Sequence, residues 1–148
     1  LLTKKTNMKT KKILIGALTG GIVMFFLGWL IYGMLLASFM EANCDNAGAR
    51  PMEEMIWWAI IASNLIWGLL LAIVLDWAAS STMASGAKMG AVFGLLAGLG
   101  FDLGMYSMTT MFSNLTIIII DSLAYSVMFA ITGALTAWVM EKVSQQKA

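Results

Sequence analysis

The sequence predicts an all-α protein, a four-helix transmembrane bundle whose amino and carboxyl termini are both cytoplasmic. The first observation is composition: 60% of the 148 residues are hydrophobic and 11% are charged, against about 25% charged in a typical soluble domain. The second is that the apolar residues form four long stretches, at residues 13–40, 52–75, 88–112 and 115–140. Each has the roughly 20 residues needed to cross a bilayer core. We therefore expect a single transmembrane domain over residues 1–148.

The ends of the four stretches carry recognisable helix signals. The first stretch is longer than the 7–15 apolar residues, roughly, of a signal peptide, so we expect an uncleaved span. Pro51 suits the first position of the second helix, and Glu53 and Glu54 suit the positive end of its dipole. Hydroxyl side chains within 76–85 could cap the third helix. Residues 113–114 provide the break between the last two helices.

Basic residues predict the orientation, because cytoplasmic loops are enriched in Lys and Arg. Only Arg50 lies in the first loop, beside several acidic residues. The lysines fall at the amino end, the second loop and the carboxyl end: Lys4, Lys5, Lys9, Lys11, Lys12, Lys88, Lys142 and Lys147. We expect a multi-pass protein of a bacterial cytoplasmic membrane, with the lipid bilayer as its main partner. The net charge of +1 predicts no nucleic-acid partner.

A ladder of glycines four residues apart runs along the third stretch: Gly86, Gly90, Gly94 and Gly98, followed by Asp102. Small residues at this spacing allow close approach of another helix in lipid. Because 3.6 residues make one turn, the stripe winds, and we expect Gly86 and Asp102 on different faces. We favour packing within the chain over contact with a second copy.

Two acidic residues lie inside the apolar stretches, Asp102 and Asp121. Folding the chain at residues 113–114 places Asp102 level with Tyr125 and Asp121 level with Tyr106, so two reciprocal Tyr–Asp hydrogen bonds become possible. Acids within a membrane are costly and mark ion paths when they are not structural. Structural hydrogen bonding is the simpler interpretation, and a proton or cation site is the alternative. Asn64 is expected to form a hydrogen bond between helices.

The sequence lacks the residue types and motifs that several kinds of catalysis and metal binding require. The chain has no His and a single Cys, and it shows neither a phosphate-binding loop nor a nucleophile with a base. Its 13 methionines are better explained as flexible apolar filler than as copper ligands. We therefore expect no enzyme activity, no metal site and no cofactor.

Short patterns at the two ends of the chain resemble a known family. The first stretch reads Phe-Leu-Gly-Trp-Leu-Ile-Tyr-Gly over 26–33, and the last reads Ile-Asp-Ser-Leu-Ala-Tyr over 120–125. Together they resemble a bacterial family of four-helix integral membrane proteins of unknown function. The resemblance supports the fold and implies no activity, and Asp102 has no counterpart in its pattern. Small multidrug transporters are similar in size only, because their essential acid lies in the first helix, where residues 13–40 have none.

Two functions remain open from the sequence. We expect a structural or accessory role, as a subunit beside other membrane proteins. The alternative is a small proton- or cation-coupled transporter that works as a homodimer, with Asp102 as its ion-coupling residue and Tyr125 and Asn64 as neighbours. A water-accessible cavity reaching Asp102 would favour transport, whereas a closed, dry bundle would favour the accessory role.

Overall fold

The computed structural model describes residues 2–145, with side chains from residue 9 onward. Its elements are α1 (Leu2–Leu30), a π-helical turn η1 (Ile31–Leu35), α2 (Ala37–Asn43), a 3-10 turn η2 (Met52–Glu54), α3 (Trp57–Trp77), α4 (Met83–Met108) and α5 (Leu115–Gln145). Four segments are long and apolar enough to cross a membrane: Lys9–Leu35, Trp57–Trp77, Met83–Met108 and Leu115–Gln145. The predicted all-α fold with four spanning helices is confirmed for this part of the chain. The predicted orientation also uses Lys4, Lys5 and Lys147, whose side chains lie outside the described ones.

The start of α3 differs from the prediction, whereas the predicted hydroxyl cap within residues 76–85 is confirmed at Thr82. Pro51 precedes the short turn η2 rather than α3, which begins only at Trp57, so Glu53 and Glu54 lie on η2 and not at the positive end of α3. Helix α4 begins at Met83, because Thr82 and Ser85 form a reciprocal capping box in which each side chain accepts a hydrogen bond from the other's backbone N–H, both at 3.1 Å.

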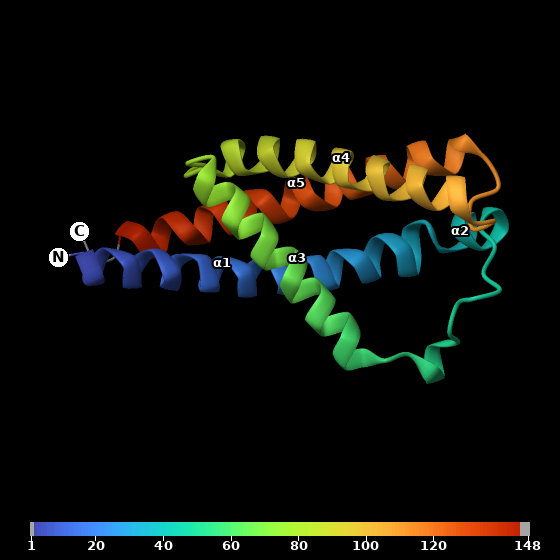
Figure 1. Cartoon of the computed structure of the whole chain (residues 1–148), viewed down its shortest axis with the longest axis horizontal. Helices are drawn as coiled ribbons and strands as arrows, with labels where there is room; N and C mark the ends of the chain where they lie inside the picture. Colours follow the sequence, from blue (N-terminus) through green and yellow to red (C-terminus); the bar gives the residue numbers. More distant parts are fainter. Residues whose placement is uncertain (1, 146–148) are drawn as a thin grey trace.

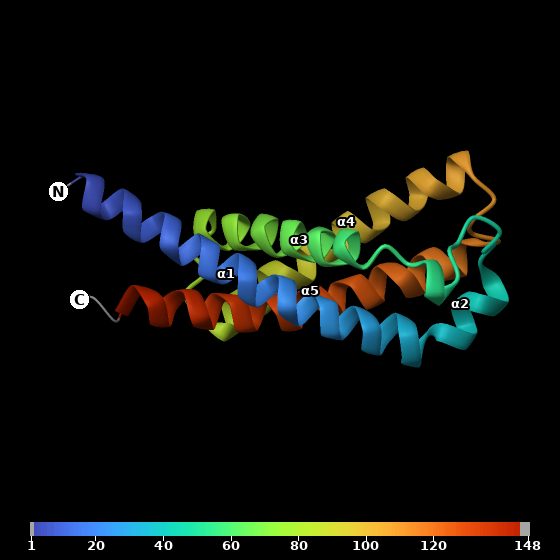
Figure 2. The same ribbon diagram turned by 90° about the horizontal axis from the view of Figure 1, so that it is seen from below.

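The helices are arranged as two pairs, α4 with α5 and α1 with α3 (Figures 1 and 2). Helices α4 and α5 form an antiparallel hairpin, α1 lies along α5, and α3 crosses α1 obliquely and diverges from α4 and α5 toward its first residue (Figure 1). The start of α1, the end of α5 and the turn between α3 and α4 lie at one end of the molecule. We call this the terminal end, and we call the opposite end, with α2 and the loops 44–56 and 109–114, the loop end.

The glycine ladder packs against α5, within the chain. A methyl group on Gly86 would overlap the carbonyl oxygen of Gly133, and one on Gly90 would overlap that of Phe129. All four ladder glycines and Asp102 are buried, although each step of four residues rotates the stripe by about 40° around the helix. The stripe winds around α4, and α5 crosses α4 at an angle that follows it. Since α5 covers the ladder, these glycines offer no contact surface to a second copy.

Glycines also bring α1 and α3 together. A methyl group on Gly68 of α3 would overlap the backbone nitrogen of Gly21 on α1, and one on Gly20 would lie 3.0 Å from the Gly68 Cα. At the terminal end, Lys9 and Lys12 form ion pairs with Asp76, at 3.2 and 3.1 Å. Close backbone contact and charge pairing therefore fix where α3 crosses α1, while the Trp57 end of α3 lies apart from the hairpin.

Candidate functional site

The two membrane-embedded acids meet inside the bundle. The Asp102 side chain on α4 is fully buried and Asp121 on α5 is 5% exposed. Their carboxyl groups lie close enough to share a hydrogen bond when one of them carries a proton. The Ser122 hydroxyl donates a hydrogen bond to Asp102 Oδ2 at 3.2 Å. We call Asp102 and Asp121 the acid pair.

The predicted Tyr–Asp pairing is wrong. The connection between α4 and α5 covers 109–114 rather than 113–114, so Asp102 lies level with Asp121 and Ser122 and not with Tyr125. Tyr106 is 41% exposed, and the side chains that interact with Asp121 are Tyr32 and Asp102. Equal counting from residues 113–114 fails because the loop covers 109–114 and is centred two residues earlier. Counting from that midpoint places Asp102 level with Asp121.

Tyr32 brings the first span to the acid pair. Its hydroxyl faces the Asp121 carboxyl, and its ring packs on that of Tyr125, with centroids 6.1 Å apart. Tyr32 lies in the π-helical turn η1, where the Leu36 N–H donates to the Ile31 carbonyl at 2.7 Å. Such single π-helical turns are frequent at functional sites. The wider turn carries the chain from α1 into α2.

The acid pair has unused hydrogen-bonding capacity. Asp102 Oδ1, Asp121 Oδ1 and the Tyr32 hydroxyl are buried and have no hydrogen-bond partner among the described residues. The ion pairs of the described side chains are both at the terminal end, on Asp76, so neither embedded acid has a basic partner. Buried like charges at close range repel unless a proton or a cation lies between them.

A pocket of about 260 Å³ connects the acid pair with the loop end. Its lining includes both acids, Tyr32 and Tyr125, and it continues to Cys44 and to the exposed Asn46. A cavity of this size with several polar groups is large enough to hold water. The acid pair is therefore not sealed inside a closed bundle.

The two loops at the loop end are held together beside this pocket. The Asp45 N–H donates to the Met111 carbonyl at 2.9 Å, and the Thr110 hydroxyl donates to Asp45 Oδ2 at 3.0 Å. The Ala47 N–H donates to Asp45 Oδ1 at 2.9 Å. The Ala47 hydrogen bond first, and the Thr110 hydroxyl second, lower the pKa of Asp45 below its usual value. The Asp45 carboxylate thus ties the α2–α3 loop to the α4–α5 loop.

Tyr32 and Tyr125 also line a second pocket, of about 190 Å³, between α1, α3 and α5. We call it the aromatic pocket. Its lining residues are Met24, Gly28, Tyr32, Ser63, Asn64, Trp67, Tyr125, Met128 and Phe129. The two tyrosine rings therefore stand between this pocket and the acid pair.

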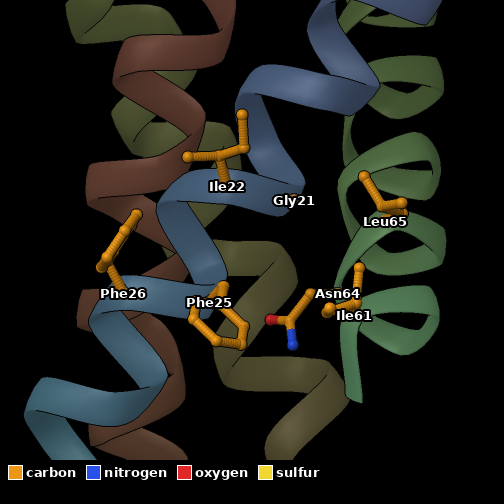
Figure 3. A pocket seen from close by; sticks show the side chains of 7 residues that line it. All are labelled: Gly21, Ile22, Phe25, Phe26, Ile61, Asn64 and Leu65. Carbon is orange, nitrogen blue, oxygen red and sulfur yellow. The ribbon is translucent and has the colours of Figure 1, made fainter. Parts of the chain in front are cut away.

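Asn64 does not form the expected hydrogen bond between helices. Its amide nitrogen donates to the Ile60 carbonyl on its own helix, at 2.8 Å, which leaves the side chain in the space between α1 and α3. There it lines both the aromatic pocket and a third pocket, of about 220 Å³, between α1 and α3, shown in Figure 3. We call the third pocket the lateral pocket.

Comparison with family models, with curated proteins and with solved structures finds no match for this chain. The fold therefore defines its class, a multi-pass helical membrane protein, on the evidence of its own four apolar helices. The resemblance of residues 26–33 and 120–125 to a bacterial four-helix family stays a prediction. Within the described residues, no group of three or more His, Cys, Asp or Glu side chains could hold a metal ion.

The sequence indicates both acids and Tyr125 as site residues, but it does not indicate Tyr32 and Ser122 as partners of the acids. Tyr32 is the only tyrosine of the first span, and Ser122 follows Asp121 directly. Both lie within the two short patterns on which the family resemblance depends. The polar residues within those two patterns include both Tyr32 and Ser122. Counting residues along the α4–α5 hairpin cannot identify a partner on the first span, such as Tyr32.

Proposed function

We propose that this chain is a small carrier of a bacterial cytoplasmic membrane that binds a proton or a monovalent cation at the acid pair. It works without catalysing a covalent reaction. One observation carries the proposal: two buried carboxyl groups lie together, each with an oxygen that lacks a partner, at the end of a pocket that continues to an exposed loop residue.

The energetics favour exchange over a purely structural role. An ionised carboxylate in the bilayer core is costly, and a structural acid is expected to have its hydrogen bonds satisfied. Asp102 Oδ1 and Asp121 Oδ1 have no partner among the described residues. One shared proton, or a cation replacing it, would satisfy both oxygens. Competition between a proton and a cation for one site is the simplest way to couple their movements.

Proton release on cation binding tests the proposal. The purified full-length protein in weakly buffered detergent should release protons when Na⁺ or K⁺ is added. The Asp102→Asn and Asp121→Asn variants should lose this release, because an amide cannot exchange a proton in this range. Glu53→Gln is the matched control, since Glu53 is an exposed acid on η2 that does not line the pocket, and it should keep the release. Absence of release from the wild-type protein with either cation would refute ion exchange at the acid pair.

The accessory role that we expect from the sequence is the second candidate. It is favoured by the first half of α3, which diverges from the α4–α5 hairpin (Figure 1) and carries the exposed side chains of Trp57 and Trp58. Such a surface could receive another membrane-protein subunit. Purification in mild detergent, with the Trp57→Ala/Trp58→Ala variant as control, tests this role. A partner that co-purifies with the wild type and is lost from the variant supports it.

A further inference from the structure

We propose that the aromatic pocket binds an organic ammonium cation, which enters from the bilayer through the lateral pocket. This inference rests on the proposed function and names its substrate class. It depends on three features of the structure. Aromatic rings line the aromatic pocket, Tyr32 and Tyr125 line both this pocket and the pocket of the acid pair, and Asn64 lines both this pocket and the lateral pocket.

The wall of the aromatic pocket suits a cation with an apolar surface. Four of its nine lining residues are aromatic, Tyr32, Trp67, Tyr125 and Phe129. The Trp67 and Phe129 rings meet edge to face at 5.8 Å, and the Tyr125 and Phe129 rings stack at 6.2 Å. Aromatic faces attract cations, and cages of such rings recognise quaternary ammonium groups. Met24 and Met128 add polarizable surface for the alkyl groups.

The acid pair lies behind the same wall. Tyr32 and Tyr125 line both the aromatic pocket and the pocket that contains Asp102 and Asp121. A cation in the aromatic pocket is therefore separated from the two carboxyl groups by a pair of tyrosine rings. Its charge favours loss of the shared proton, and the proton on the acid pair disfavours the cation. The coupling is reciprocal, as for any two linked binding equilibria.

The titratable groups around the acid pair come from each element that packs against it. Tyr32 comes from η1, Asp102 from α4, and Asp121 and Tyr125 from α5, while Cys44, which directly follows α2, lines the same pocket. Helix α3 contributes Ser63, Asn64 and Trp67 to the aromatic pocket, and none of these titrates. The described lysines that form ion pairs do so at the terminal end.

The lateral pocket provides the entrance. It is lined by Gly21, Ile22, Phe25 and Phe26 of α1 and by Ile61, Asn64 and Leu65 of α3. Figure 3 shows the Asn64 amide turned toward the Phe25 ring. Asn64 is the only polar residue of this lining, and it is also part of the aromatic pocket. An ammonium ion with apolar substituents can partition into the bilayer and pass between α1 and α3. Its positive charge then meets the Asn64 amide before it meets the rings.

Binding of benzyltrimethylammonium to the purified full-length protein tests this inference, measured by equilibrium dialysis. We expect saturable binding for which the uncharged isostere neopentylbenzene does not compete, and release of protons on binding. The Trp67→Leu variant should bind about tenfold more weakly, from the loss of one cation–π contact, whereas Trp67→Phe should retain most of the affinity. Trp77→Leu is the matched control, because Trp77 lies at the far end of the same helix and is 77% exposed. It should bind like the wild type.

The outcomes separate this inference from the proposed function. If Na⁺ or K⁺ releases protons from the wild type but benzyltrimethylammonium does not bind, the ion site stands and the organic-cation site is refuted. Binding that Trp67→Leu leaves unchanged, in a variant with the wild-type circular dichroism spectrum, also refutes the aromatic pocket as the site. Should Trp67→Leu fail to fold, the affinity of Trp67→Phe decides: a loss as large as tenfold contradicts the cation–π assignment.

Discussion

At the scale of single residues, the acid pair is held by few hydrogen bonds. Asp102 accepts from the Ser122 hydroxyl, and the remaining interactions of the two carboxyl groups are with each other and with Tyr32. In a bilayer, a hydrogen bond between helices contributes about 0.6 kcal/mol on average. The position of the acids is therefore set mainly by the backbone packing of α4 on α5, and the hydroxyl adjusts the Asp102 carboxyl locally.

This division of roles predicts the effect of Ser122→Ala. We expect the free energy of unfolding to fall by about 1 kcal/mol, because Asp102 loses its hydroxyl donor and keeps a buried carboxyl with fewer partners. Thermal unfolding in detergent, followed by circular dichroism, measures the change. Ser107→Ala is the control, since the exposed Ser107 hydroxyl donates only to the Gly104 carbonyl oxygen on its own helix. A stability loss as large in Ser107→Ala as in Ser122→Ala would contradict the prediction.

At the scale of helices, glycines decide which surfaces meet. Close backbone contacts at glycines join two pairs of helices. The ladder of α4 packs on α5, and Gly68 of α3 packs on Gly21 of α1. Helix association in lipid has no hydrophobic drive comparable with that in water, so close backbone packing supplies much of the stability. Larger side chains at the ladder positions would separate α4 from α5 and displace Asp102 from Asp121.

The substitution Gly90→Ala tests this packing. Its methyl group would overlap the Phe129 carbonyl oxygen, which is backbone and cannot rotate away, so we expect a loss of stability of about 1–3 kcal/mol. Gly100→Ala is a matched control on the same helix, because a methyl group there meets no atom within 4 Å. Gly100→Ala should be neutral or stabilising by up to about 1 kcal/mol through helix propensity. Thermal unfolding of both variants measures the difference, and equal effects would refute the packing argument.

At the scale of the whole molecule, the two ends differ in chemistry. The terminal end carries the Lys9 and Lys12 ion pairs to Asp76, whereas the loop end carries Cys44 and the opening of the acid-pair pocket. With the lysines in the cytoplasm, the pocket would open to the outer side. The orientation in the membrane can therefore be measured by labelling one thiol, because Cys44 is the single cysteine of the chain.

We therefore expect a membrane-impermeant maleimide added to intact cells to label Cys44. Burial raises the pKa of the Cys44 thiol, with smaller contributions from Asp121 and Asp102, so the thiolate fraction is small at neutral pH and labelling should accelerate as the pH rises. Ser144→Cys in a Cys44→Ser background is the control, since residue 144 lies at the terminal end and should react only after the cells are opened. Labelling of that variant in intact cells would reverse the proposed orientation.

The sequence by itself determined the number of apolar helices, their approximate bounds and the two acids within them. These follow from local composition, because bilayer thickness fixes helix length and acids are rare in such helices. Only the tertiary structure decided that Asp102 meets Asp121 and Ser122, and that Tyr32 meets Asp121. Which residues meet across helices depends on where the 109–114 loop begins and ends and on the π-helical turn at Ile31–Leu35. These are geometric properties of several segments together, which no single stretch of sequence encodes.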